Sequence, residues 1–326
     1  MLRRDFVRAV VLLASPLSTR AQQSGKVPRI AFLALNNPES ARQLLAAFRQ
    51  GMREHGWVDG QNIVIELRFA QGKTERLPAL VAELIDTKVD IIVATSSVAT
   101  KIAKDATQSI PIVMATSLDA LGEGFVVSLA HPGGNVTGMT FFAGPEIAGK
   151  QLELLKTAIP SATRIAVLTN PNNAAVPTFI HESRVAARAF GLQVQSIEAR
   201  SPDQLDAAFA AMTSEHASAL LVVSDSLFYG QRRRIVALAA RNMLPAMYSQ
   251  KEFVDAGGLI SYGANLPDMY RRAAAHVDKI LKGASPQDIP VEQPTKFELV
   301  INRNTAKVLG ITIPQALLLR ADELIQ

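Results

Sequence analysis

The stretch that decides the fold is IIVATSSVATKIAKDATQSIPIVMATS, residues 91–117. Two short apolar runs, 91–94 and 112–115, both end in small hydroxyl residues, and the segment between them has helical spacing. A strand, a helix and a second strand in this order predict a βαβ unit with two parallel strands. Their carboxyl ends are expected side by side, with the hydroxyls of these residues at one edge of the sheet: Thr95, Ser96, Ser97, Thr116 and Ser117.

The same alternation of strands and helices continues in both directions from this unit. A first series has predicted strands at 27–35, 62–70, 91–94, 112–115 and 136–141, with helices such as 39–55 between them. A second series begins near residue 146 and has predicted strands at 164–169, 192–197, 219–224, 245–249 and 259–262, followed by a helix over 266–282. Apolar strands alternating with amphipathic helices predict an α/β chain with two doubly wound parallel-sheet lobes.

Composition and net charge exclude some classes of function for this chain. The chain has 326 residues, enough for two domains, and no cysteine, which excludes disulfides and a lipid anchor on cysteine. The formal net charge is +5, but four of the basic residues and one acidic residue lie in the first 21 positions, which leaves +2 for the remainder. This near-balance, without basic runs interleaved with aromatic residues, argues against nucleic acid as a partner.

The amino terminus, MLRRDFVRAVVLLASPLSTRAQQ, has the pattern of an export signal. A basic start precedes an apolar run over 9–14, which is too short to span a bilayer, and then the small-residue site Thr19-Arg20-Ala21. The sequence therefore predicts a signal peptide over 1–21 and a mature chain from Gln22, free in the periplasm without a membrane anchor. Arg3 and Arg4 leave both the general and the twin-arginine export routes open.

No motif predicts catalysis, a cofactor or a metal. The run GPEIAGKQ, 144–151, resembles a phosphate-binding loop but has Gln151 where a hydroxyl residue must bind magnesium. Gly122-Glu123-Gly124 resembles part of a dinucleotide fingerprint, but it precedes a strand and Val127 takes the place of the third glycine, so a loop is predicted. The five histidines show no metal-ligand spacing, and neither hydroxyl cluster has an acid or a histidine beside it.

Polar residues follow most of the predicted strands in both series. In open parallel sheets, ligands bind beyond the carboxyl ends of the strands, so two facing lobes would line one cleft with these side chains. Helix capping is the alternative explanation for any single one of them, since serine, asparagine and aspartate are preferred N-caps. The candidates at strand ends, besides the hydroxyl residues above, are Asn36, Asn170, Asn172, Asp225 and Tyr248.

Several long segments resemble one family. They include AHPGGNVTGMTF (130–141), GGLISYGANLPDMYRRAAAHVDKILKG (257–283) and PVEQPTKFELVINRNTAKVLGITIPQALLLRADELI (290–325), and the likeness extends over nearly all of 26–326. The chain resembles the ABC transporter substrate-binding proteins related to tryptophan/tyrosine uptake.

The resemblance implies the type I periplasmic-binding-protein fold, in which three crossings join the lobes, here near 142–146, 261–265 and 284–296. Lobe 1 would comprise 26–143 plus 264–286. Lobe 2 would comprise 144–263 plus 287–326, including a last strand at 297–301.

The resemblance also implies a function. The expected function is capture of a small solute, with an aromatic amino acid as the best-supported ligand, and delivery to an ABC permease with its separate ATPase. A monomer whose lobes close on the ligand about a hinge is expected. Two alternatives stay open, a binding module that reports to a membrane receptor and, less favoured, an enzyme on the same fold.

Roles for the candidate residues follow from this resemblance. Ser96, Ser97, Thr116 and Ser117 are expected to hold the carboxylate of an amino acid, together with the N–H groups at the start of the following helix. Asp225 is the one acid at a strand end of the second lobe and is assigned to the ammonium. Three aromatic residues are expected beside the ligand's aromatic or apolar side chain: Tyr248, Tyr262 and Phe141.

Overall fold

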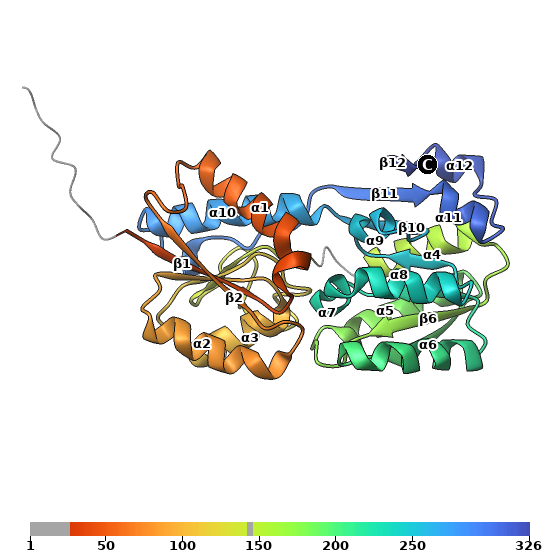
Figure 1. Ribbon diagram of the computed structural model, residues 1–326, viewed down its shortest axis with the longest axis horizontal. Coiled ribbons are helices and arrows are strands. Elements are labelled where there is room, and N and C mark those ends of the chain that lie inside the picture. The colour runs from red at the N-terminus through yellow and green to blue at the C-terminus, as the bar shows by residue number, and fades with distance from the viewer. Residues whose placement is uncertain (1–26, 142–145) are drawn as a thin grey trace, which may run out of the picture.

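The structure is a computed structural model that describes residues 27–141 and 146–326. The predicted signal peptide, 1–21, and positions 142–145 of the first predicted crossing lie outside the described residues. Figure 1 shows two α/β lobes side by side along the long axis of the molecule. Within the described ranges, no helix is both long and apolar enough to cross a membrane.

Lobe 1 is built on a parallel sheet. In the described chain its strand order is β2-β1-β3-β4-β5, and every neighbouring pair is parallel, as predicted. The strands are β1 (Arg29–Ala34), β2 (Val64–Phe69), β3 (Ile91–Ala94), β4 (Ile112–Met114) and β5 (Val136–Gly138). The last strand ends at Gly138 rather than at residue 141, because Gly138 has φ +125°, which is outside the extended region of a strand. A Cβ there would lie 2.2 Å from the Met114 carbonyl oxygen, so this position requires glycine.

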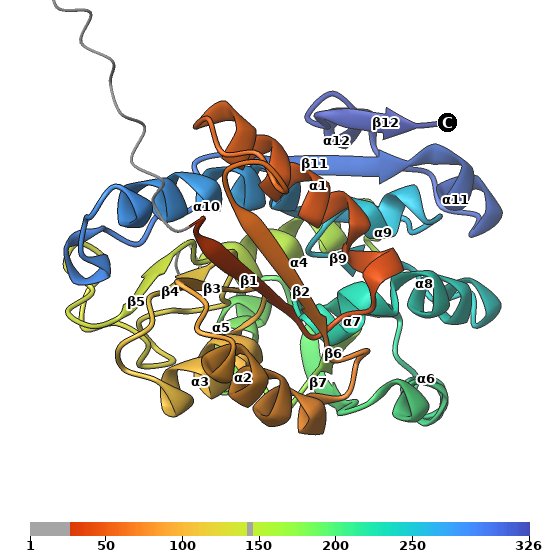
Figure 2. The same ribbon diagram turned by 60° about the vertical axis from the view of Figure 1, so that its left-hand side comes forward.

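Helices cover both faces of this sheet (Figure 2). Side chains alternate along β1, so Phe32 packs with the helices on one face, and Leu33 packs with those on the other. One face is covered by α1 (Pro38–Glu54) and α10 (Leu266–Leu281), the other by α2 (Leu77–Asp86) and α3 (Ser97–Ala106); a 3₁₀ turn, η1 (Thr74–Arg76), precedes α2. The predicted helix over 266–282 thus covers lobe 1, although it follows the strands of lobe 2 in the sequence.

Lobe 2 has a larger sheet with one reversal. In the described chain its order is β12-β11-β10-β9-β8-β6-β7; β6 to β10 are parallel, whereas β11 is antiparallel to β10. The strands are β6 (Arg164–Thr169), β7 (Gln193–Glu198), β8 (Ala219–Val222), β9 (Ala246–Tyr248), β10 (Ile260–Ala264), β11 (Phe297–Asn302) and β12 (Glu323–Ile325). The reversal arises because β11 returns to lobe 2 from lobe 1 and enters the sheet from the opposite end (Figure 1).

The helices of lobe 2 also lie on both faces of the sheet. Buried side chains of α4 (Glu146–Ala158), α5 (Val176–Ala189) and α12 (Gln315–Leu318) pack on one face. Those of α6 (Leu205–Ser214), α8 (Arg232–Arg241) and α9 (Lys251–Asp255) pack on the other. The remaining short elements are α7 (Ser226–Gly230), α11 (Arg303–Val308), η2 (Pro202–Gln204) and η3 (Pro286–Asp288).

One part of the predicted division into lobes differs from the structure. Residues 287–292 were expected in lobe 2, but they pair with lobe 1. Thr137 Oγ1 donates to the Ile289 carbonyl at 2.7 Å, and the Glu292 N–H donates to the Gly138 carbonyl at 2.8 Å. The segment therefore extends the lobe 1 sheet beside β5, and the chain crosses back only between residue 292 and β11. The second crossing is at Asn265, the N-cap of α10, inside the predicted range.

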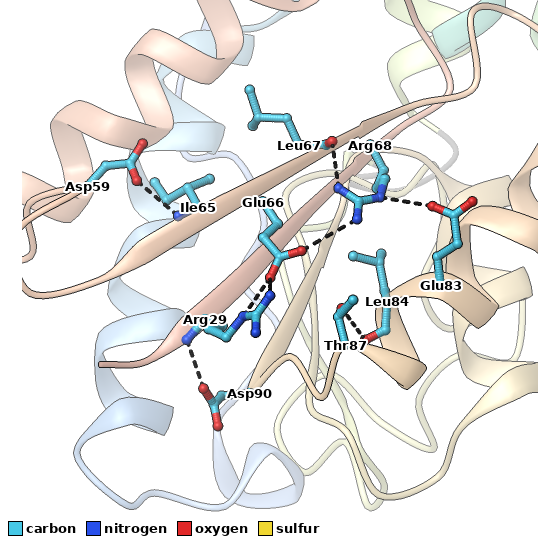
Figure 3. Close-up of polar contacts among 10 residues, drawn as sticks. All are labelled: Arg29, Asp59, Ile65, Glu66, Leu67, Arg68, Glu83, Leu84, Thr87 and Asp90. Atoms are coloured by element: carbon cyan, nitrogen blue, oxygen red, sulfur yellow. Dashed lines mark hydrogen bonds and ion pairs between the residues drawn. The ribbon is translucent and has the colours of Figure 1, made fainter. Parts of the chain in front are cut away.

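A charged network lies at the outer side of lobe 1 (Figure 3). Glu66 on β2 accepts from Arg29 Nε at 2.7 Å and pairs with Arg68, which also contacts Glu83 on α2. The Arg29 backbone N–H donates to Asp90 at 2.7 Å. Arg29 and Asp90 mark the amino ends of β1 and β3, and Arg68 lies near the carboxyl end of β2, so this network runs along the sheet and ties its strands together.

Candidate ligand-binding site

A cavity between the lobes collects the polar strand ends. It has ≈ 520 Å³ of space between atoms, part of which is open to solvent. Seven of the predicted residues line it: Asn36, Ser96, Ser97, Thr116, Ser117, Phe141 and Asp225. The other lining residues are Leu44, Thr95, Val98, Leu118, Asn173, Ser224, Ser226, Tyr229, Gln250, Leu266 and Tyr270.

The wall from lobe 1 holds polar atoms without partners. Thr95 Oγ1, Ser117 Oγ and Asn36 Oδ1 are all buried and have no hydrogen-bond partner among the described residues. A buried polar group without a partner costs about 1–3 kcal/mol, so such groups are rare in folded proteins. Three unpartnered polar groups around one cavity indicate a surface that forms hydrogen bonds with a ligand.

Ser96 caps a helix, which was the alternative to ligand binding for the polar residues at strand ends. It is the N-cap of α3, and its Oγ accepts from the Ala99 N–H at 3.2 Å. The hydroxyl hydrogen is not used by this bond, so Ser96 can cap the helix and still donate into the cavity. The start of α3 also directs backbone N–H groups toward this region, which favours negative charge.

Ser97 differs from the expectation that its hydroxyl is free for a ligand. Its Oγ accepts from the Leu118 N–H at 2.9 Å and contacts Glu123 Oε2 at 2.7 Å. The same carboxylate oxygen accepts from the Asp119 N–H at 3.3 Å. Burial is the main cause that raises the pKa of Glu123 to about 7, and the hydrogen bond from Ser97 opposes that shift. Sequence reasoning had placed Glu123 in a loop without a role.

The wall from lobe 2 is built around Asp225. This residue is the N-cap of α7, and its Oδ1 accepts from the Leu227 N–H at 2.8 Å and from Asn170 Nδ2 at 3.2 Å. Asn173 Nδ2 donates to Oδ2 at 3.4 Å. Burial raises the pKa of Asp225, and these hydrogen bonds oppose the rise. A cationic group in the cavity would supply the counter-charge that the described residues around Asp225 do not provide.

Apolar and aromatic side chains complete the cavity. Leu44 of α1 and Leu266 of α10 line it together with Phe141, Tyr229 and Tyr270. Burial raises the pKa of both tyrosines, so each keeps its hydroxyl hydrogen. Tyr270 donates to the Thr95 carbonyl at 3.3 Å, whereas the Tyr229 hydroxyl is buried without a partner in the described structure. Such rings give apolar contact area with a polar tip.

Two predicted aromatic residues do not line the cavity. Tyr248 is 1 % exposed and stacks on Phe253, with ring centroids 4.8 Å apart, because alternation along β9 turns it into the core beneath α8 and α9. Tyr262 lies inside β10, which runs to Ala264 rather than ending at residue 262. It packs against Phe297 of β11, with ring centroids 5.9 Å apart.

Two predicted asparagines also lie outside the cavity lining. Asn170 is buried and donates a hydrogen bond to the Asp225 carboxylate, so it contacts a lining residue without lining the cavity itself. Asn172 is exposed and lines a neighbouring pocket with Glu123. Asn173, the next residue, takes the position in the cavity that was expected for its neighbours.

The lining residues that sequence reasoning missed are mostly on helices. Tyr270 shares a helix face with Ala273, three residues further on, and both are buried on α10, so the helical period over 266–282 carried a signal for it. Tyr229 lies on α7, which spans only five residues and has no readable period. Within the described part of the chain, no group of three acidic, histidine or cysteine side chains is placed to hold a metal ion.

Two lobes with largely parallel sheets, covered by helices on both faces, and a polar cavity between them define a two-lobed solute-binding protein of the type I periplasmic fold. The chain belongs to the ABC transporter substrate binding protein family, whose pattern it matches over residues 29–325. A relative is the tyrosine-binding protein of Clostridioides difficile (strain R20291), 27 % identical over 288 residues, which are 88 % of this chain and 82 % of the relative.

Solved structures are similar over almost the whole chain. The ABC domain from Streptococcus pneumonia in complex with L-Trp has a TM-score of 0.85 and 27 % identity, covering 92 % of this chain and 100 % of that one. A ligand-free, open substrate-binding protein from Clostridium difficile covers 92 % of this chain and 99 % of that one at 24 % identity, but its TM-score is 0.64. The present chain is thus closer in shape to the ligand-bound relative than to the open one.

Proposed function

We propose that this protein is the exported receptor of an ABC importer and binds an amino acid, preferably an aromatic one, in the cavity between its lobes. The observation that carries the proposal is that the two walls of the cavity, one from each lobe, present different polar groups. Lobe 1 presents unpartnered hydroxyls and the start of α3, and lobe 2 presents the buried carboxylate of Asp225. An α-carboxylate fits the first wall and an α-ammonium fits the second.

The cavity lining and the relatives support an aromatic side chain. Tyr229, Tyr270 and Phe141 supply rings, and Leu44 and Leu266 supply aliphatic surface. The relatives described above include one named for tyrosine and one solved with L-Trp. The seven predicted residues that line the cavity are proposed to contact the ligand, and Asn170 is proposed to position Asp225.

The partners and the location belong to the same proposal. The receptor would act as a monomer in the periplasm after removal of residues 1–21, and it would deliver its ligand to a permease driven by a separate ATPase. It would bind and release the solute without chemical change. A mature chain that starts near Gln22, measured by mass spectrometry of exported protein, supports this account, and a chain that retains Arg3 and Arg4 contradicts it.

Calorimetry on residues 22–326 tests the ligand class. We expect L-tryptophan or L-tyrosine to bind, and L-leucine to bind more weakly. Asp225→Asn is expected to weaken binding by at least about 30-fold, because loss of one member of a buried charge pair costs about 2–5 kcal/mol. Asp203→Asn, an exposed change on the same lobe, is the matched control and should bind as the parent does. Equal binding by the parent and Asp225→Asn would refute the assignment.

A further inference from the structure

Glu123 is a half-buried acid that the proposed ligand contacts do not use. It lies in the loop after β4, where its carboxylate contacts the Ser97 hydroxyl. It also lines a second pocket between the lobes, beside the main cavity, which is bounded by Ser97 and Lys101 from lobe 1 and by Asn172 and Asn173 from lobe 2. Ser97 and Asn173 line both pockets, so Glu123 lies one side chain away from the ligand cavity.

The hydrogen-bond capacity of Ser97 limits what it can do. A hydroxyl has one hydrogen to donate and two lone pairs that accept. The Leu118 N–H occupies one lone pair at 2.9 Å. If Glu123 is ionised, its oxygen at 2.7 Å can only accept, so it takes the single hydrogen of Ser97. If Glu123 is protonated, it can donate to the second lone pair of Ser97, and the hydrogen of Ser97 becomes available to the cavity.

We propose that Glu123 is a positioning residue that decides whether Ser97 can donate to an anionic group of the ligand, so that binding of the anion is accompanied by uptake of one proton from solvent. The inference rests on the proposed function, because it assumes that the carboxylate of an amino acid lies against Ser97. It adds that capture is favoured at low pH and release at high pH.

The charges around Glu123 are consistent with a group that takes up a proton near neutral pH. Asp119 in the same loop and Asp225 across the cleft both raise the pKa of Glu123, in addition to burial. On α3, Lys101 pairs with Asp105 at 2.8 Å, and Lys104 donates to the Gly124 carbonyl at 2.6 Å.

The remaining lining of that pocket does not titrate. Thr74, next to α2, and the lobe 2 residues Asn172, Asn173 and Ala174 are uncharged, as are the apolar side chains that complete it.

Calorimetry with L-tryptophan and L-tyrosine at pH 6 and pH 8, in buffers of different ionisation enthalpy, measures both affinity and proton uptake. Because the pKa of Glu123 is about 7, affinity should fall about tenfold from pH 6 to pH 8, and up to one proton should be taken up at the higher pH. Glu123→Gln has a permanent donor for Ser97 and should keep the pH 6 affinity at both pH values without proton uptake.

Ser97→Ala should bind more weakly at both pH values and lose the pH dependence. Glu75→Gln, an exposed change of the same kind in lobe 1, should behave as the parent does. Titration of the ligand itself is common to all variants and cancels in the comparison. Retention of the tenfold pH effect in Glu123→Gln, or its absence in the parent, would overturn the inference.

A second measurement separates this inference from the ligand class. If neither amino acid binds, the proposed ligand is wrong, and carbon NMR titration of glutamate carboxyls in the free protein still tests Glu123, whose signal is assigned by its loss in Glu123→Gln. The expected pKa is about 7, and it should rise in Ser97→Ala, where the hydrogen bond that lowers it is gone. An ordinary glutamate pKa in the free protein would refute the inference.

Discussion

Ser96 and Ser117 are both serines at strand ends that face the same cavity, yet their side chains have different surroundings. The Ser96 hydroxyl accepts from the Ala99 N–H and caps α3. The Ser117 hydroxyl is buried and has no partner in the described structure. The sequence could not separate helix capping from ligand binding for either residue. In the structure, Ser96 caps a helix, whereas Ser117 has no capping bond.

Ser117→Ala separates affinity from stability. Removing a buried hydroxyl that has no partner should leave the free energy of unfolding unchanged or slightly raised. Affinity for L-tryptophan should fall by about tenfold or more, since a hydrogen bond to a charged group contributes about 1.5–3 kcal/mol. Urea denaturation and calorimetry on the same sample measure both quantities. The control, Ser96→Ala, should lose about 1 kcal/mol of stability through the lost cap. Unchanged affinity in Ser117→Ala would contradict the proposed role.

The sequence located strand ends better than it located individual side chains. Hydroxyl clusters after two adjacent parallel strands must share one edge of the sheet, so Ser96 and Thr116 could be placed from order alone. Tyr248 was misplaced because alternation along β9 turns its side chain into the core, and Tyr262 because β10 continues two residues beyond it, so that it does not lie at a strand end. The bond between Ser97 and Glu123 joins residues 26 positions apart and left no sequence pattern.

Two helices that are distant in sequence, α1 and α10, pack closely on one face of lobe 1. Gly51 lies at their contact, where a Cβ would fall 2.1 Å from the Arg271 carbonyl oxygen and 2.8 Å from Ala274 Cβ. The absence of a side chain at Gly51 therefore allows the backbones to approach. Because Leu44 and Tyr270 of the same two helices line the cavity, this contact also sets one wall of the site.

Gly51→Ala should lower the free energy of unfolding by about 1–3 kcal/mol, since overpacking forces the two backbones apart. Gly149→Ala is a matched control inside α4, where the new Cβ would meet Ala186 Cβ at an ordinary 3.4 Å. There the better helix propensity of alanine should make the protein equally stable or up to about 1 kcal/mol more stable. Chemical denaturation compares the two variants, and equal stabilities would show that the close approach is not restrictive.

Long elements were predicted from their periodicity, whereas several short ones were missed. The helix over 39–55 and the strand over 164–169 have enough residues for a clear pattern, and the structure confirms both. The five-residue helices α7 and α9 and the three-residue strand β12 are too short to show a period. The antiparallel direction of β11 was also hidden, because an apolar run does not reveal from which end it enters a sheet.

The two lobes together enclose the cavity, and neither lobe alone contains all of its polar groups. Asp225 faces the cavity from lobe 2, and Ser117 faces it from lobe 1. An exposed ion pair between Arg233 and Glu39, 3.4 Å apart, joins the lobes at the rim. Such a pair contributes at most about 1 kcal/mol, so the ligand is expected to supply most of the free energy that holds the lobes together.

Small-angle scattering tests hinge closure. Saturation with L-tryptophan should lower the radius of gyration, because the crossings permit rotation of the lobes and the unpartnered cavity groups gain partners when the lobes meet on the ligand. Asp225→Asn should need a much higher ligand concentration to reach the same compact state. An unchanged radius, with binding shown by calorimetry in the same buffer, would count against closure.

The return of the chain to lobe 1 after β10 affects how the protein is synthesised and folded. When residues 27–141 have left the ribosome, all five strands of the first sheet exist, but α10 and the segment that pairs with β5 do not. Phe48 and Met52 of α1 then lack part of their packing, and lobe 2 likewise waits for β11 and β12. Both cores are completed only by residues from 266 onward, so folding depends on contacts between distant segments and is slow. A chain that stops at residue 264 should aggregate rather than form an independent first lobe.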